Sequence, residues 1–169
     1  MATTDAVFAA FLRCTTKAYL LGRVAIGDGN YSDLHASRFS YTRKLKLRAV
    51  EWLRSVASEG ECYVGMPSLP NLETGRYPLI LDPLMESSQV CSQPEALLRI
   101  AASGAPGAHY CPVRFIVRDK ALPDDRLLLA FDAIAISRVT GRLPHTGKLI
   151  CGARLTTLTI PLVKLLERV

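Results

Sequence analysis

The chain has 169 residues, a length typical of one domain and sufficient to bury a hydrophobic core without disulfides or metals. Hydrophobic residues make up 49% and charged residues 21%, which excludes disordered, collagen-like and coiled-coil proteins. The formal net charge of +6 favours polyanionic partners such as nucleic acid, although it also lies within the ordinary range for solubility.

Five widely spaced cysteines, with no Cys-x-x-Cys pair, argue against a self-contained zinc site and against a disulfide-rich secreted protein. The N-terminus carries Asp5 and lacks a basic segment and a long apolar run, so we expect no signal peptide. No apolar run reaches about 18 residues, the length that crosses a membrane. These features predict a reduced, cytoplasmic protein without a membrane anchor.

Two helices are expected in the first third of the chain. Apolar residues three and four apart predict a helix over 5–21, with Thr4 as its N-cap and Gly22 as its end. A second helix, over 33–57, is amphipathic. Its apolar stripe consists of Leu45, Ala49, Trp52, Leu53 and Val56.

The spacing of the apolar residues then changes. Short apolar runs at 61–66, 76–85 and 109–117 predict strands, and the middle run continues into a further strand near 89–91. A long helix is expected from Pro123 to the glycine at 141. One or two strands follow within 148–162. The last residues resemble the opening of another helix, with Pro161 at its first position, so we expect the chain to be part of a longer protein.

The element order predicts an α/β fold with a mixed sheet and a crossover helix. It contains the helix, three strands, helix, strand order of the restriction-endonuclease-like core, which other α/β folds share. We therefore expect a single domain over 1–169 with such a core, a mixed sheet flanked by helices.

Basic residues are concentrated between Arg38 and Arg54, where Phe39 and Tyr41 could also stack on bases. Such a helix face can neutralise phosphates, and it can equally be an ordinary solvated face opposite the apolar stripe. The candidates for contact with nucleic acid are Arg43, Lys44, Lys46 and Arg48.

Carboxylates suggest a second kind of chemistry. Metal-dependent cleavage of phosphodiesters needs two or three acids around a divalent cation and a lysine near the attacking water. Asp82 follows an apolar run, and Glu95 precedes the strand that contains Arg114. That strand has no acid-x-Lys pair, and Asp119 comes only at its far end. Each acid could instead be a turn or cap residue.

Several segments resemble a family of RecB-like nucleases, whose first helix carries a cysteine, two residues and then Lys-Ala-Tyr-Leu. In this chain Cys14 and the run Lys17-Ala18-Tyr19-Leu20 match that pattern. Other tracts resemble the family in the same order. They are Pro94–Arg99, His109–Phe115, Asp125–Ala133 and Pro144–Gly152.

The resemblance implies a PD-(D/E)XK nuclease fold, related to CRISPR-associated RecB-like exonucleases, that acts on DNA with Mg²⁺ or Mn²⁺. It places the metal-binding acid at Glu95 and the acid-x-Lys pair near Pro112 to Arg114. Proline cannot bind a metal through its side chain, and arginine stays protonated, so the site departs from the family pattern. We assign Glu95 and Asp82 as metal ligands and catalytic residues, with Arg114 at the lysine position and Asp119 as an alternative acid.

In these relatives the first cysteine joins three others near the C-terminus to hold a 4Fe-4S cluster. Cys14 matches the first of the four, and the other cysteines of this chain lack the required spacing. We therefore expect no cluster in this chain alone, and allow for a C-terminal or separate partner domain. Three functions stay open: a DNA nuclease, a catalytically inactive nucleic-acid-binding domain, and an assembly module without a nucleic-acid role.

Overall fold

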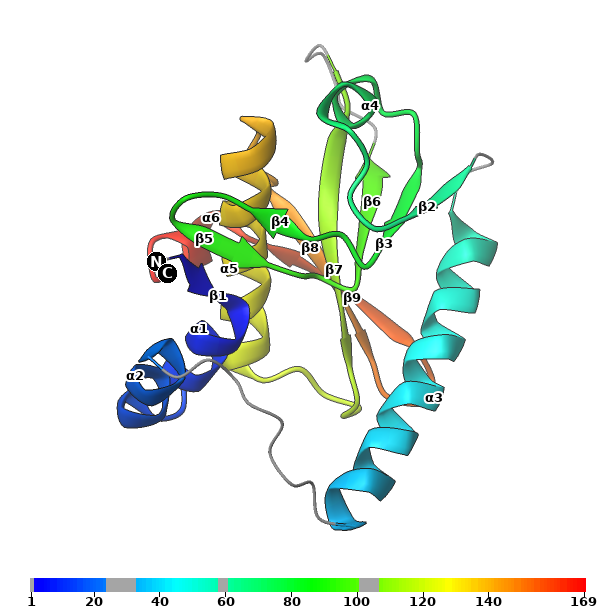
Figure 1. Cartoon of the computed structure of the whole chain (residues 1–169). Helices are drawn as coiled ribbons and strands as arrows, with labels where there is room; N and C mark the ends of the chain where they lie inside the picture. Colours follow the sequence, from blue (N-terminus) through cyan, green and yellow to red (C-terminus); the bar gives the residue numbers. More distant parts are fainter. Residues whose placement is uncertain (1, 24–32, 58–60, 101–106) are drawn as a thin grey trace.

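The computed structural model describes residues 2–23, 33–57, 61–100 and 107–169, and within 33–42 it describes the backbone only. A six-stranded mixed sheet occupies the centre of the molecule, with a long helix on each side, and a three-stranded mixed sheet lies beside one of these helices (Figure 1). The prediction of an α/β fold with a mixed sheet flanked by helices is therefore confirmed.

The N-terminal region forms β1 (Thr3–Thr4), α1 (Asp5–Phe11) and α2 (Thr15–Arg23). Thr4 caps α1 as predicted, because its hydroxyl accepts a hydrogen bond from the Val7 amide at 3.2 Å. The expected single helix over 5–21 is wrong, since the chain turns after Phe11 and α2 packs back against α1. No proline or glycine marks this turn, so the helical spacing of the apolar residues gave no sign that the helix ends there.

The remaining elements follow in chain order. The helices are α3 (Asp33–Val56), α4 (Leu69–Thr74), α5 (Pro123–Thr140) and α6 (Val163–Leu166). The strands are β2 (Cys62–Val64), β3 (Leu79–Leu81), β4 (Met85–Glu86), β5 (Val90–Ser92), β6 (Ala96–Ile100), β7 (His109–Ile116), β8 (Thr146–Cys151) and β9 (Thr156–Pro161).

The large sheet has the strand order β2-β3-β6-β7-β8-β9. Strands β3, β6 and β7 form an antiparallel meander, and β7 pairs in parallel with β8. Parallel neighbours need a crossover connection, which α5 supplies here. The small sheet has the order β1-β5-β4, so it ties the N-terminus to the segment between β3 and β6.

Each face of the large sheet packs against one long helix. On one face, Ala49 and Leu53 of α3 contact a cluster that includes Leu79, Val113 and Phe115. On the other face, α5 packs through Leu129, Ile136 and its buried alanines. It approaches β8 so closely that a Cβ at position 147, a glycine, would lie 2.6 Å from Leu129. Alternate residues of each strand therefore face different helices.

Some local predictions need correction. Strand β6 was not expected, because the run Ala96-Leu97-Leu98-Arg99 has no strand-like alternation. Helix α4 lies where a turn was expected and begins with proline near its first position. Pro161 ends β9 and does not begin the last helix. Val56 belongs to the apolar stripe of α3 but is 53% exposed.

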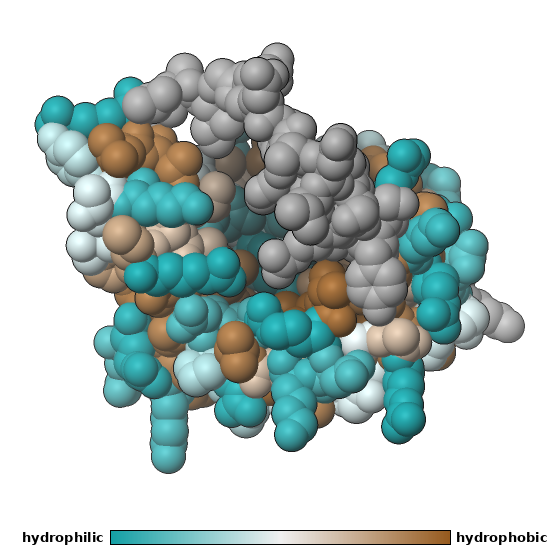
Figure 2. All heavy atoms as spheres, turned by 90° about the horizontal axis from the view of Figure 1, so that it is seen from below, coloured by the Kyte–Doolittle hydropathy of each residue, from teal (hydrophilic) through white to brown (hydrophobic). Residues whose placement is uncertain are grey.

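Among the described residues, no helix is both long enough and apolar enough to span a membrane. Figure 2 shows one face of the molecule, on which hydrophilic and hydrophobic side chains are interspersed around a central hollow. A continuous apolar surface is not visible on the coloured part of that face.

Candidate functional site

A cavity of about 500 Å³ lies between the middle of α3 and the edge of the sheet where β3 ends and β6 begins. It brings together the two carboxylates assigned as metal ligands from the sequence and two of the four basic candidates. The lining residues are Arg43, Lys46, Leu47, Val50, Asp82, Glu95 and Phe115.

The pairing of β3 with β6 places the two acids beside each other. Leu81 is opposite Ala96 in this antiparallel pair, so the residues that follow and precede them are also neighbours. The Asp82 amide donates a hydrogen bond to the Glu95 carbonyl at 3.1 Å. Asp82 has a φ of 48°, a left-handed conformation that aspartate tolerates better than most residues. Such backbone conformations are concentrated at functional sites.

Glu95 has a defined partner for each carboxylate oxygen. Lys46 Nζ lies 2.9 Å from its Oε1, and the Phe115 amide donates to its Oε2 at 3.3 Å. The side chain of Glu95 is 13% exposed, whereas that of Lys46 is 48% exposed. The carboxylate is thus held in place at the cavity wall, with the lysine on its solvent side.

Of the four basic candidates on α3, two line the cavity and two do not. Arg43 and Lys46 line the cavity, and Leu47 and Val50 continue the same side of α3. Lys44 and Arg48 are exposed but are not among the lining residues, because each successive helical residue is rotated by about 100°. Phe39, Tyr41 and Arg38 have side chains outside the described residues.

Arg114 faces away from this cavity. It alternates with Val113 and Phe115 along β7, which turn toward α3, so its own side chain points toward α5. There its Nε lies 2.6 Å from Asp132 Oδ2, and one terminal nitrogen lies 2.7 Å from Asp132 Oδ1 and 2.9 Å from Asp5 Oδ2. Ser92 donates a hydrogen bond to the same Asp132 carboxylate.

This buried network explains the charge state of Arg114. Burial disfavours the charged guanidinium, but attraction and hydrogen bonds from Asp132 outweigh burial and raise the pKa of Arg114 above its ordinary value. Burial raises the pKa of the Asp132 carboxyl, while Arg114 and Ser92 oppose that rise. The pair joins β7, α5, the small sheet and α1, which is a structural role that the sequence did not reveal.

Two carboxylates can bind a divalent cation of the Mg²⁺ or Mn²⁺ type. Mg²⁺ sites commonly use one or two carboxylates and complete the shell with waters and substrate phosphates. Among the described residues, no three His, Cys, Asp or Glu side chains are grouped closely enough for a metal site. Asp82 and Glu95 both line the cavity, so a cation held there would take its remaining ligands from water or phosphate. Asp119 lies elsewhere, beside residue 152.

The cysteines do not form a cluster. Cys14 is exposed at the start of α2, Cys62 and Cys91 are half-buried, and Cys111 and Cys151 are buried in the sheet. Burial raises the pKa of the Cys111 thiol to about 11, although nearby Lys148 lowers it in part. A buried, protonated thiol is a poor metal ligand or nucleophile.

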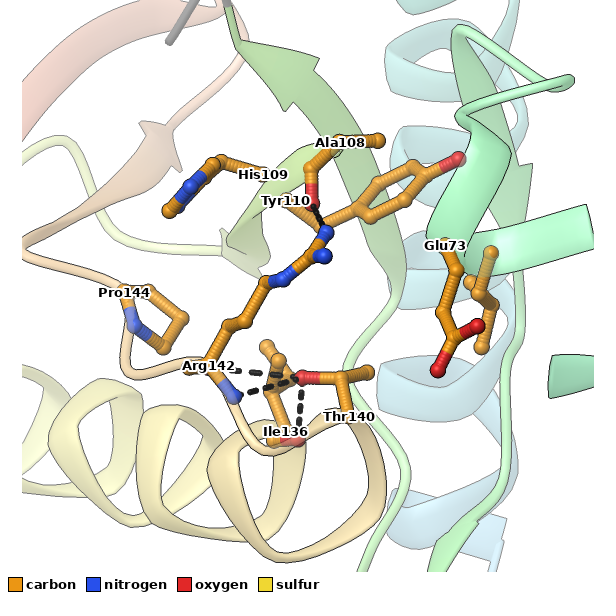
Figure 3. A pocket seen from close by; sticks show the side chains of 9 residues that line it. Glu73, Ala108, His109, Tyr110, Ile136, Thr140, Arg142 and Pro144 are labelled. Carbon is orange, nitrogen blue, oxygen red and sulfur yellow. Dashed lines mark hydrogen bonds between the residues drawn. The ribbon is translucent and has the colours of Figure 1, made fainter. Parts of the chain in front are cut away.

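A smaller cavity of about 10 Å³ lies between α4, β7 and the end of α5 (Figure 3). Its polar groups largely satisfy one another, since Arg142 donates to the Ala108 carbonyl at 2.8 Å and Thr140 donates to the Ile136 carbonyl. Figure 3 shows His109 and Glu73 on opposite sides of this space, not directed at each other. The volume suits about one water molecule, so this is a packing junction.

Neither a scan of protein-family models nor a search of the curated proteins found a match to this chain.

Proposed function

We propose that this chain is a RecB-like, metal-dependent nuclease domain of the PD-(D/E)XK type, which binds a phosphodiester of DNA in the cavity beside α3. The observation that carries the proposal is the meeting of Asp82, Glu95, Lys46 and Arg43 in one cavity. The order of the main elements supports it. With β2, α4 and the small-sheet strands β4 and β5 set aside, the chain runs α3, β3, β6, β7, α5, β8, which is the helix, three strands, helix, strand order expected for a restriction-endonuclease-like core.

Each of the four charged lining residues has a chemical task in this proposal. Asp82 and Glu95 hold the cation, which when bound supplies a more acidic water and neutralises charge on the phosphate. Lys46, beside Glu95, replaces the lysine that β7 lacks and carries a positive charge next to the reacting phosphate. Arg43 contacts a neighbouring phosphate through its planar guanidinium.

The first experiment is titration of Mn²⁺ into chelator-treated protein, followed by cleavage of labelled DNA with and without Mn²⁺. We expect saturable binding that Glu95→Gln abolishes, together with loss of cleavage. Lys46→Gln is the matched control at the same ion pair: it removes a positive charge, so Mn²⁺ binding should strengthen by about twofold to fivefold while cleavage falls. Full cleavage by Glu95→Gln would refute the assignment.

A second candidate function is a nuclease-derived domain that binds nucleic acid without cutting it. The specific observation in its favour is that β7 presents Val113 and Phe115 to the cavity side and offers no third acid there. The same experiment separates the two functions. DNA binding with no Mn²⁺ uptake and no cleavage would select the binding domain.

A further inference from the structure

A second cavity, of about 270 Å³, lies under the C-terminal turns of α3 and shares no lining residue with the first. Trp52 and Val56 of α3 form one wall. Pro78 and Ile100, at the opposite ends of the paired strands β3 and β6 from Asp82 and Glu95, contribute to the other wall. Most of the side chains around this cavity are apolar and one is an indole ring, but polar atoms also reach its surface.

Two cationic residues of the sheet line this cavity, Lys148 and Arg99. Lys148 of β8 lies on the same face as Ile150, which packs against α3, whereas Leu149 between them packs with α5. Among the described residues, no carboxylate lines this cavity and no ion pair involves Lys148. Arg99 also borders the cavity, but its guanidinium donates to the carbonyl of residue 75.

We infer that this cavity binds a nucleotide, with the base against Trp52 and the phosphate near Lys148. An indole ring among apolar side chains, with Lys148 and Arg99 as cations and no acid among the described lining residues, is complementary to a flat ring that carries a negative charge. Bases stack on aromatic side chains with little regard to sequence, and lysine binds phosphate as a point charge. The choice of a nucleotide over other aromatic anions rests on the proposed nucleic-acid role of the first cavity.

Trp52 is the single tryptophan of the chain, so its fluorescence reports directly on this cavity. The probes are thymidine monophosphate, thymidine, inorganic phosphate and a short oligothymidylate, each titrated in the presence of a chelator so that no metal or cleavage contributes. We expect saturable quenching by thymidine monophosphate, weaker quenching by thymidine and none by phosphate. Absence of quenching by both nucleotide probes would overturn the inference.

Variants locate the binding. Lys148→Gln should weaken binding of thymidine monophosphate by roughly tenfold, and Lys148→Arg should restore most of it. Val56→Glu adds a carboxylate at an exposed wall position and should also weaken binding, whereas Lys46→Gln in the first cavity should leave it unchanged. Equal affinity in wild type and Lys148→Gln would overturn the inference, and near-ultraviolet circular dichroism checks that each variant is folded.

The probes also separate the possible sources of the nucleotide. An oligothymidylate that binds far more tightly than the monophosphate, still dependent on Lys148, supports a residue of a DNA strand. Equal affinities support a free nucleotide. Quenching without Mn²⁺-dependent cleavage would reject the proposed nuclease chemistry and keep the nucleotide site, whereas cleavage without quenching would reject this site alone.

Discussion

Arg114 carries its positive charge in a part of the interior where only paired charges are stable. Its guanidinium is 10% exposed and the Asp132 side chain is fully buried, so each charge depends on the other. Breaking such a pair costs more than never forming it, because the partner that is left behind has no water to solvate it. Arg114, which the family resemblance places at the position of the catalytic lysine, therefore has a structural role on the α5 side of the sheet.

We expect Arg114→Met to lower the free energy of unfolding by about 3–5 kcal/mol near pH 8. Without the arginine, burial holds the pKa of Asp132 above its value in the unfolded chain. The folded state then keeps a proton that the unfolded state has lost, so stability falls as pH rises above about 4. Urea unfolding at pH 5 and pH 8 should therefore show a larger loss at pH 8.

The double variant Arg114→Met, Asp132→Asn is the matched control for this prediction. It removes both charges at nearly constant volume, so it should be more stable at pH 8 than Arg114→Met and should lose most of the added pH dependence. A single variant as stable as wild type would contradict the structural role of the network and would reopen a catalytic role for Arg114.

At the scale of elements, the N-terminal helices are attached to the core through few contacts. Phe8 of α1 stacks on Phe131 of α5 with ring centroids 4.8 Å apart and an interplanar angle of 13°. Asp5, at the start of α1, pairs with Arg114. The short pairing of β1 with β5 adds a third link, and Leu12 and Leu127 pack with the stacked rings. Local unfolding of α1 and α2 should therefore require less free energy than unfolding of the central sheet.

Phe8→Ala should therefore loosen α1 and α2 selectively. Loss of a buried phenylalanine costs about 3–5 kcal/mol when its surroundings do not collapse, and here the loss falls on one small cluster. Hydrogen exchange should accelerate for amides of α1 and α2 and change little for β6, β7 and β8. Phe11→Ala is the control in the same helix, because Phe11 is 56% exposed and should have almost no effect.

Uniform acceleration across the sheet in Phe8→Ala would mean that the N-terminal helices and the core unfold as one unit. Exchange unchanged everywhere would mean that the stack with Phe131 contributes little to the attachment.

The same elements show what the sequence could and could not predict. Amphipathic periodicity located α3 closely. The proline at its start and the glycine at 141 located α5, which is not one-sided, since all of residues 129–133 are buried. Strand β6 escaped prediction because its residues favour a helix, and it is a strand only through pairing with β3 and β7. Asp82 and Glu95 stood out as acids beside apolar runs, but their meeting depends on that unpredicted strand.

The other residues of the site could not be predicted because their roles depend on partners that are distant in the sequence. Lys46 could not be chosen among the basic residues of α3 until the packing of the helix placed it beside Glu95. The role of Arg114 was hidden for the same reason, since its partner Asp132 lies on the crossover helix. Local patterns carry no information on which side chains meet across a sheet.

At the scale of the whole molecule, the net charge of +6 gives no information on which surface would bind a polyanion. The cavity beside α3 gives that charge a location, because Arg43 lines it and the neighbouring Lys44 does not. Both side chains are exposed, and each neutral variant lowers the net charge by one. A comparison of the two variants therefore separates local binding from general attraction.

We expect DNA binding, measured by fluorescence anisotropy across a series of salt concentrations in the presence of a chelator, to weaken linearly on a log–log plot. Arg43→Gln should reduce the steepness of that plot by about 0.7 to 0.9, the contribution of one phosphate contact on single- or double-stranded DNA. Lys44→Gln should leave the slope nearly unchanged, because its side chain points away from the cavity. Equal reductions of the slope in both variants would mean that DNA binding depends on the overall charge of α3 and not on the cavity. Binding that does not depend on salt concentration would contradict a phosphate-binding function.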